Sequence, residues 1–319
     1  MLDLMPEAKA SADGRPATPR GLRRPAFLMN PPFSYATEVA NNAWMEELDP
    51  EERQPEFRKA MAQFLEVYRW LASEAMVYLL PTPRERTLQD LVFTGNLGVV
   101  LEHLEDDVAV ISNFSADGRQ GETEVGARFF ESLGYQTHVA PAKFEGDAEL
   151  KHLHDNLYAG GYGQRTQPEA YEWMEQNFDM EVVRLRHDDE YLYHLDCTVF
   201  PLTREKTLVC TELYDRDQIK ELELQTEILD VPLDACYSGI CNSVRLSNVI
   251  LNSSNIHEMK RGTEDYISER QKNHLIEDIA ADNAMEVIYF NLSEYHKGGA
   301  LLSCMVMHLN RYSYAFSLV

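Results

Sequence analysis

The sequence has few cysteines, no excess of positive charge and no long hydrophobic segment. Lys and Arg total 29 against 53 Asp and Glu, a formal net charge of −24, so the surface repels phosphate backbones and anionic lipids. No apolar run approaches the roughly 18 to 20 residues of a membrane span, and the N-terminus lacks the apolar stretch of a secretory signal. We therefore expect a soluble, cytoplasmic protein that binds neither nucleic acid nor a membrane.

The cysteine pattern argues against both disulfides and zinc. The 319 residues contain five cysteines, an odd number spread thinly through a large chain: Cys197, Cys210, Cys236, Cys241 and Cys304. Reduced thiols are expected from this usage. Cys236 and Cys241 with His257 match no common zinc spacing and lack a fourth ligand. Nucleotide loops of the G-x-G-x-x-G or G-x-x-x-x-G-K-[ST] type are absent as well, so we expect no metal and no cofactor.

The chain divides into an arm and one domain. Residues 1–24 mix Pro, Gly, Ala and charge without apolar periodicity, which predicts a flexible arm. The four arginines of this arm could form a targeting signal, but interspersed acidic residues weaken that interpretation. No Gly/Ser-rich linker follows, and 44% of the chain is hydrophobic. We therefore interpret residues 25–319 as a single domain.

Short strand-like segments alternate with helical ones beyond the arm. Apolar residues at three- and four-residue steps predict a helix from Phe57 to Leu71, and further helices are expected near 122–133, closed by Gly134, and near 264–282. The strand candidates are 90–94, 108–112, 135–140, 156–161, 181–186, 190–200, 206–212, 245–252, 285–291 and 301–309. This pattern indicates an α/β chain without the regular rhythm of a doubly wound sheet.

Two acidic motifs are candidates for chemistry. His194 and Asp196 flank Leu195 in a strand-like run, where residues two apart share a face with side chains roughly 7 Å apart. A base and a carboxylate would then face one pocket, although such a pair is most often structural. Glu145, Asp147 and Glu149 surround a glycine after a strand; they suit a cationic substrate, and the alternative is an ordinary acidic turn.

Two glycine-rich segments carry the remaining candidates. The run from Gly160 to Thr166 delivers Arg165, whose guanidinium could hold the carboxylate of an amino acid; a surface arginine in a tight turn is the alternative. Cys304 follows a glycine pair at an expected loop-to-strand junction. It is the favoured nucleophile of the five cysteines, although a lone cysteine is most often a small buried hydrophobe.

Taken in order, these segments resemble the guanidino-group modifying enzymes of the pentein superfamily, and most closely the arginine dihydrolase domain. The superfamily also includes arginine deiminase, dimethylarginine hydrolase, agmatine deiminase and the amidinotransferases. The resemblance spans roughly residues 25–312. It rests on FLMNPPFSYATEVANNAWM (27–45), DLVFTGNLGVVL (90–101), RQGE (119–122), FEG (144–146), YAGGYGQRT (158–166), YHLDCTVFPL (193–202), CNSV (241–244) and GGALLSC (298–304).

The resemblance implies a five-bladed α/β propeller with a central active site. By motif, Cys304 is the nucleophile, His194 the general acid and base, and Glu145 and Asp196 the carboxylates that grip the guanidinium. Arg165 is the clamp on the substrate α-carboxylate. A guanidinium carbon is a poor electrophile because its charge is delocalised, so attack requires a thiolate held above the planar group.

Further residues of the matching segments complete the expected site. Asp90 and Asn96 are expected to bind substrate, and Asn96 stands where deiminases carry an aspartate. Asp147 or Glu149 fills the place of the carboxylate that follows FEG in the family. Residues 252–275 look longer than their dihydrolase counterpart. They are expected to form a lid, an oligomer contact or a solvated helical insertion, so a homo-oligomer is possible.

The function implied is a cysteine-dependent hydrolase that acts on the guanidinium of arginine or a close analogue through a covalent thiouronium on Cys304. The alternative is an amidinotransferase, in which an acceptor amine replaces water. A lesser alternative is an inert pentein that binds an amino acid or a protein.

Overall fold

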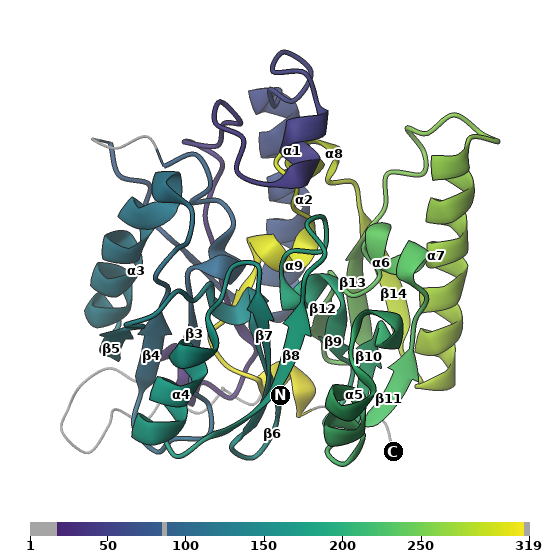
Figure 1. The fold of residues 1–319 in the computed structure, drawn as a ribbon. Helices are drawn as coiled ribbons and strands as arrows, with labels where there is room; N and C mark the ends of the chain where they lie inside the picture. The colour runs from purple at the N-terminus through teal and green to yellow at the C-terminus, as the bar shows by residue number, and fades with distance from the viewer. Residues whose placement is uncertain (1–17, 85–87, 316–319) are drawn as a thin grey trace, which may run out of the picture.

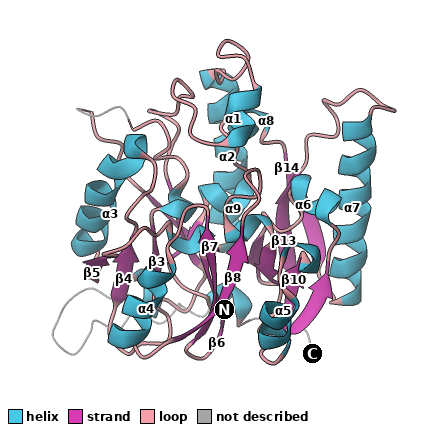
Figure 2. Cartoon of the chain, in the orientation of Figure 1, coloured by secondary structure: helices cyan, strands magenta, loops and turns pink. Residues whose placement is uncertain are grey.

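The computed structural model describes residues 18–84 and 88–315, so most of the expected arm, residues 1–17, lies outside the described residues. Within them, the strands form five three-stranded sheets. Figure 1 shows helices on the periphery and short strands and turns toward the middle, and Figure 2 shows the same arrangement by element type. This is the α/β propeller that the sequence resemblance implies.

All five sheets follow one pattern. The first strand pairs antiparallel with the second, and the second pairs parallel with the third after a helical crossover, as parallel neighbours require. The first two sheets are β3 (Gly98–Val100), β4 (Val108–Ile111) and β5 (Gln136–Val139), with crossover helix α3 (Gln120–Ser132), and β6 (Leu150–His154), β7 (Leu157–Gly163) and β8 (Glu181–His187), with crossover helix α4 (Pro168–Asn177). The next two are β9 (Val199–Pro201), β10 (Lys206–Val209) and β11 (Glu227–Asp230), with crossover helix α5 (Arg216–Glu223), and β12 (Val244–Leu246), β13 (Val249–Ser253) and β14 (Glu286–Phe290), with crossover helix α7 (Glu264–Asp282).

The fifth sheet joins the two ends of the domain. Its first strand is β15 (Met307–His308), which pairs with β1 (Ala26–Met29), and α2 (Phe57–Glu74) then leads to β2 (Met76–Leu79). In the register of this sheet Phe27 faces His308. Pairing the last described strand with the first closes the circle of sheets and leaves β1 paired on both sides, between β15 and β2.

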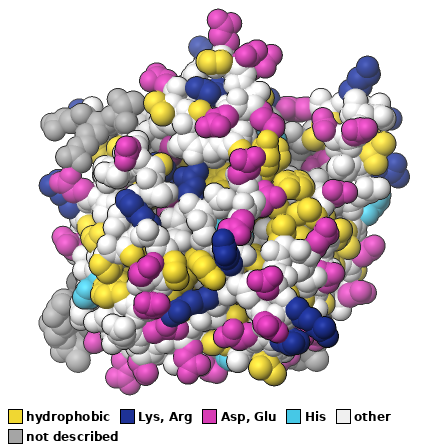
Figure 3. Space-filling model, viewed as in Figure 1, with side chains coloured by type: hydrophobic (Ala, Val, Ile, Leu, Met, Phe, Trp, Pro, Cys, Tyr) yellow, Lys and Arg dark blue, Asp and Glu magenta, His cyan; other side chains and the backbone are white. Residues whose placement is uncertain are grey.

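Burial distinguishes the inner from the outer strands. The first strand of each sheet is largely buried, whereas β2, β5 and β11 at the opposite edge are half-buried or exposed. Short helices fill the remaining connections: α1 (Ala43–Glu47), α6 (Leu233–Tyr237), α8 (Ser293–His296) and α9 (Leu302–Met305). Acidic side chains are spread over the face shown in Figure 3, with Lys and Arg among them. No helix in the described part of the chain is long and apolar enough to cross a bilayer.

The three helices predicted from the sequence are confirmed, but several strand predictions are wrong. Residues 90–94 form turns ahead of β3, residues 190–198 form a loop and a 3-10 helix ahead of β9, and residues 302–305 are helical. The predicted strand 245–252 is a hairpin that turns at Ser247, where φ is 55°. Apolar residues in these turns are buried by the neighbouring sheets, so burial alone gave them the appearance of strands.

Two segments differ from their expected roles. At the end of the expected arm, residues 18–24 are held against the domain: the Arg20 side chain pairs with Asp107 at 2.7 Å, and Asn310 donates to the Pro19 carbonyl at 3.0 Å. In the region expected to be an insertion, only 254–263 is an exposed loop. The residues that follow begin α7, the crossover helix of its sheet, which buries Lys272 and Ile276.

Candidate active site

The site is built from the turns that precede the innermost strands. Asn96 ends the 3-10 helix Thr94–Asn96 before β3, and Glu145 precedes the 3-10 helix Gly146–Ala148 before β6. His194 precedes the 3-10 helix Leu195–Cys197 before β9, Asn242 precedes β12, and Cys304 lies in α9 before β15. Because the inner strands surround one centre, the pattern brings five distant polar residues together.

Glycine permits the close packing of these turns. A Cβ on Gly95 would lie 2.5 Å from the Ser303 carbonyl oxygen, next to the Cys304 backbone. Gly146 has a φ of +68°, and a Cβ there would lie 2.8 Å from the carbonyl oxygen of Asn96. A residue with a side chain would therefore push the Asn96 and Cys304 turns outward.

His194 and Glu145 form a buried pair. Glu145 Oε2 lies 2.8 Å from His194 Nε2, and Glu145 Oε1 accepts hydrogen bonds from the Ser115 hydroxyl at 2.6 Å and the Ser115 amide at 3.1 Å. Burial favours the neutral acid, but the hydrogen bond and charge of His194, with Arg165, outweigh it and hold the pKa of Glu145 below its ordinary value. Glu145 is therefore an ionised carboxylate that orients the imidazole.

Asn96 lies against the same imidazole. Its Nδ2 is 3.4 Å from Nδ1 and 3.5 Å from Nε2 of His194. These nearly equal distances place the amide beside the ring rather than in line with one nitrogen. Asn96 thus limits how far the ring can turn.

Cys304 is enclosed by polar partners. Its Sγ lies 3.7 Å from Asp196 Oδ2 and 3.4 Å from Nδ2 of Asn242. The neighbouring Ser303 hydroxyl donates to the same Asp196 oxygen at 2.5 Å. Burial, with the Asp196 charge, raises the pKa of the Cys304 thiol to about 12, although the Asn242 hydrogen bond opposes the shift. The thiol is therefore protonated while no cation is present.

Arg165 lies at the margin of the site. Its guanidinium stacks over the Tyr193 ring with 4.8 Å between Cζ and the centroid, and its Nη1 is 3.9 Å from Glu145 Oε1. It also donates to the carbonyl of Asn41, in the segment before α1. That segment is tied to the opposite side of the site, because Asn42 donates to the Gly298 carbonyl at 3.0 Å. Residues 41–42 thus link Arg165 to the glycine pair that precedes Cys304, and Cys304 is only 4% exposed.

Asp90 belongs to a neighbouring buried network. Its Oδ2 accepts a 2.6 Å hydrogen bond from Asn41, while its Oδ1 has no hydrogen-bond partner among the described residues. Burial raises the pKa of Asp90, and nearby Arg119 opposes the shift. Arg119 itself pairs with Glu122 at 2.9 Å. The structure therefore brings Asp90 to Asn41, the residue that also accepts from Arg165.

The two other predicted acids point elsewhere. Asp147 is 2.9 Å from both His308 Nδ1 and Arg311 Nη2. Glu149 Oε2 is 3.2 Å from His187 Nε2 and accepts a 3.1 Å hydrogen bond from the Leu195 amide. Within the described residues, neither carboxylate has a hydrogen bond or ion pair with Cys304, His194 or Glu145. Glu149 instead fixes the turn that carries His194.

The possible zinc ligands are not assembled. Cys236 and Cys241 are buried in an apolar cluster, whereas His257 is in the exposed 254–263 loop. No group of three His, Cys, Asp or Glu side chains suited to a metal occurs in the described ranges.

Sequence reasoning missed the partners of the catalytic candidates. Asn242, Ser303 and Ser115 were not singled out, although CNSV and GGALLSC were recognised as matching segments. The available signal was the position of each segment directly before an inner strand. Reading that spacing requires knowing that Val244 and Met307 begin strands, which the apolar pattern did not resolve.

Comparison with known proteins agrees with this arrangement. The family model of eukaryotic N,N dimethylarginine dimethylhydrolase matches residues 31–311. The chain belongs to this family. It is thus a pentein of the guanidino-group modifying enzymes, as its sequence motifs indicated. Among curated family relatives, the dimethylarginine dimethylaminohydrolase of Mycobacterium tuberculosis is 31% identical over 185 residues, 57% of either chain.

The arginine dihydrolases of cyanobacteria are also similar to this family member. The bifunctional arginine dihydrolase/ornithine cyclodeaminase AgrE of Nostoc sp. is 30% identical over 89% of this chain, and the alignment spans only 37% of AgrE. The structure of unliganded AgrE superposes with a TM-score of 0.78 at 25% identity, covering 91% of this chain and 40% of AgrE. The N-terminal domain of ArgZ bound to substrate has a TM-score of 0.77 at 24% identity, covering 90% of this chain and 98% of that domain.

Proposed function

We propose that the protein is a cysteine-dependent hydrolase that acts on the guanidinium of arginine or a close analogue. The observation that carries this proposal is the enclosure of the Cys304 thiol between Asp196 and Asn242. Asp196 lies two residues after His194, whose ring is held by a buried carboxylate. Membership of a guanidino-modifying family supports it, as does the arginine dihydrolase named among its relatives.

Substrate binding activates the nucleophile. Asp196 is the carboxylate nearest the sulfur, so it grips the planar cation beside Cys304. The positive charge of the guanidinium then lowers the pKa of the thiol, which is otherwise raised to about 12 by burial and by Asp196. The thiol gives its proton to the His194 imidazole, and the resulting thiolate attacks the guanidinium carbon and forms a carbon–sulfur bond. Positioning in the enclosed site replaces a slow bimolecular encounter.

His194 transfers the protons. A carbon–nitrogen bond of the tetrahedral adduct breaks, and the departing amine takes a proton from the imidazole, which leaves a covalent thiouronium on Cys304. The imidazole next removes a proton from water, whose oxygen attacks the same carbon. The carbon–sulfur bond then breaks and frees the thiolate. Glu145 keeps the ring oriented through both transfers, and Arg165 holds the substrate carboxylate.

The products depend on which amine leaves and on how many rounds follow. One hydrolysis of arginine gives citrulline and ammonia, and a second gives ornithine, carbon dioxide and ammonia. In the alternative amidinotransferase, the alkylamine leaves and an acceptor amine captures the amidino group. Both routes use the same residues, so product analysis is required to separate them.

The test is incubation of the purified protein with arginine, and separately with dimethylarginine, followed by assay of citrulline, ornithine and ammonia with and without candidate amines. Hydrolysis predicts ammonia or dimethylamine without an acceptor. Ornithine without ammonia, dependent on an added amine, would establish transfer instead. Cys304→Ala is expected to abolish turnover while retaining substrate binding, and turnover by that variant would refute the proposed mechanism. Absence of turnover by the unmodified protein with every substrate would favour the inert pentein.

We also propose that residues 25–319 form one catalytic domain and act in the cytoplasm. The five unpaired cysteines support a reducing compartment. Relatives such as AgrE carry a longer chain, so the proposal concerns this domain.

A further inference from the structure

A second cavity lies away from the catalytic residues. It has a volume of about 840 Å³ and is lined by the end of β6, the turn into β7, the loop after β3 and the segment after β15. In Figure 1, β6 lies at the lower edge of the molecule, below α9 with Cys304. Cys304, His194, Glu145 and Arg165 do not line this lower cavity. It is therefore separate from the site described above.

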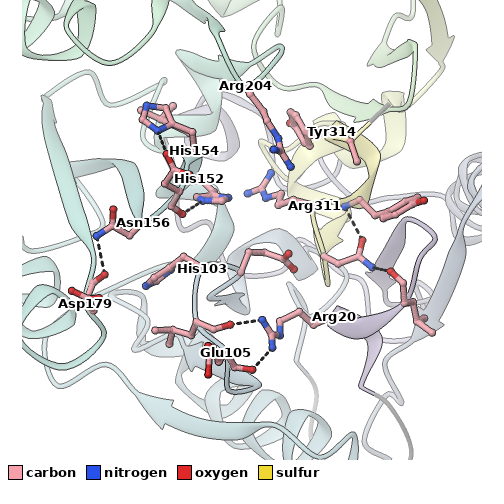
Figure 4. A pocket seen from close by; sticks show the side chains of 18 residues that line it. Arg20, His103, Glu105, His152, His154, Asn156, Asp179, Arg204, Arg311 and Tyr314 are labelled. Atoms are coloured by element: carbon pink, nitrogen blue, oxygen red, sulfur yellow. Dashed lines mark hydrogen bonds and ion pairs between the residues drawn. The ribbon is translucent and has the colours of Figure 1, made fainter. Parts of the chain in front are cut away.

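Basic side chains converge in the lower cavity. Figure 4 shows the guanidinium groups of Arg204 and Arg311 and the ring of His152 directed toward the same region. Arg311 donates to Asp147 at 2.9 Å, which fixes its position. Within the described part of the chain, Arg204 has no hydrogen bond, ion pair or ring contact. One anchored and one free guanidinium thus face a shared space, an arrangement that suits a carboxylate.

The surroundings of the lower cavity keep a histidine in its lining neutral. Burial, reinforced by the charges of Arg311 and Arg204, lowers the pKa of His152 to about 4. The His152 imidazole is therefore neutral, and its Nε2 contacts the Asp155 carbonyl oxygen at 2.7 Å. A bound carboxylate would give Arg204 the charge-assisted partner that it lacks among the described residues.

A buried acid lines the same cavity. Glu102 Oε1 is buried and has no hydrogen-bond partner among the described residues. Burial raises the pKa of Glu102 to about 7, although Arg311 opposes the shift. An unpartnered buried carboxylate oxygen is costly unless a donor reaches it. A ligand that carries a cationic donor as well as an anion would satisfy both kinds of group.

We propose that the lower cavity binds a zwitterionic α-amino acid, with its carboxylate between Arg204 and Arg311 and its ammonium group toward Glu102. The mixed lining favours this class over a phosphate, because carboxylates at Glu102, Glu105, Asp155 and Asp179 also line the cavity and repel a dianion. The inference is independent of the proposed reaction, since it uses none of the catalytic residues.

The test is calorimetric titration with L-alanine, L-ornithine and L-glutamine, which lack a guanidinium and are not turned over. Propionate and phosphate serve as probes that carry an anion alone. Arg204 is exposed, so Arg204→Ala removes the free guanidinium without opening the core. Arg128→Ala is the matched control, because Arg128 lies on α3 and is 77% exposed. Arg165→Ala reports binding at the catalytic site.

At least one amino acid is expected to bind saturably to the wild type, Arg128→Ala and Arg165→Ala, and at least about tenfold more weakly to Arg204→Ala. Glu102→Gln should weaken amino-acid binding but not propionate binding. Three outcomes would overturn the proposal: no saturable binding up to about 10 mM, unchanged affinity in Arg204→Ala, or loss in Arg165→Ala alone. Tighter binding of phosphate than of every amino acid would also reject the proposed ligand class.

Discussion

Glu145 Oε2 and His194 Nε2 are 2.8 Å apart in a buried pair. Oε1 also accepts both hydrogen bonds of Ser115, so three of the roughly four acceptor positions of the Glu145 carboxylate are occupied. Asp196 contacts the Cys304 sulfur instead. Two carboxylates that the sequence motifs treated alike thus have different partners, and in the proposed mechanism Glu145 orients the base while Asp196 receives the cation.

The first prediction concerns the protonation of Cys304. Burial and Asp196 raise the pKa of its thiol to about 12, so the thiolate fraction should increase about tenfold per pH unit through neutral pH. The rate of inactivation by iodoacetamide is therefore expected to rise from pH 7 to pH 9 without a plateau. Peptide mass analysis, with Cys304→Ala as the control, assigns the reaction to this thiol. A plateau within that range would show that the resting thiol is already ionised.

A cationic reagent gives a complementary measurement. Chloroacetamidine carries the positive charge that Asp196 is placed to bind, and its charge stabilises the thiolate. It should label Cys304 faster than neutral chloroacetamide at pH 7.5, and Asp196→Asn should remove most of this advantage. Equal rates with the two reagents would mean that no cation site adjoins the sulfur.

The second prediction concerns Asn242. Its Nδ2 donates toward the Cys304 sulfur at 3.4 Å, and its Oδ1 accepts from the Ser303 amide at 2.8 Å. Asn242→Ala removes both contacts and should lower kcat by roughly 10 to 100-fold with little change in KM. Asn242→Asp adds a negative charge beside the sulfur, so it should slow alkylation at a given pH more than Asn242→Ala does. Exposed Asn177 on α4 provides the control, and wild-type kcat in Asn242→Ala would exclude the positioning role.

The order of the motifs selects candidate site residues, whereas the apolar pattern locates the strands around them less well. Cys304, His194 and Asn96 are candidates because their motifs occur in a recognisable order, and the structure places them in turns before inner strands. The strands themselves were harder to locate. Segments 90–94 and 190–198 are rich in apolar residues because neighbouring sheets cover them. The apolar residues of such a buried turn do not follow a periodic pattern that would distinguish the turn from a buried strand.

The acidic turn shows a second limit. Glu145, Asp147 and Glu149 alternate along the chain, which predicts a shared face only in a strand. The 3-10 helix Gly146–Ala148 instead sends them to His194, His308 and His187, respectively. His187 ends β8 of the sheet that the acidic turn enters, whereas His194 precedes β9 and His308 lies on β15, both of other sheets. Only the tertiary structure therefore determines which carboxylate meets which histidine.

The third prediction separates carboxylate recognition from chemistry. Arg165 stacks on Tyr193 at the margin of the site, so Arg165→Ala should raise KM for arginine by roughly 10 to 100-fold, the usual effect of losing a charge-assisted pair. Agmatine lacks the carboxylate, and its kinetic constants should change much less. Arg186→Ala is the matched control because Arg186 is exposed and pairs with Asp188. An unchanged KM for arginine would place the carboxylate elsewhere.

The fourth prediction concerns the backbone that supports the site. Gly146 has a φ of +68°, and a Cβ there would lie 2.7 Å from the Gly98 amide nitrogen and 2.8 Å from the Asn96 backbone. Gly146→Ala combines left-handed strain with a backbone clash and should lower the free energy of unfolding by at least about 2 kcal/mol. Gly118→Ala is the control, because its Cβ would meet no atom within 4 Å and its φ is not in the left-handed region. Urea unfolding of the two variants measures the difference. Equal stability of the two variants would mean that the turn relaxes at no cost, and it would contradict this prediction.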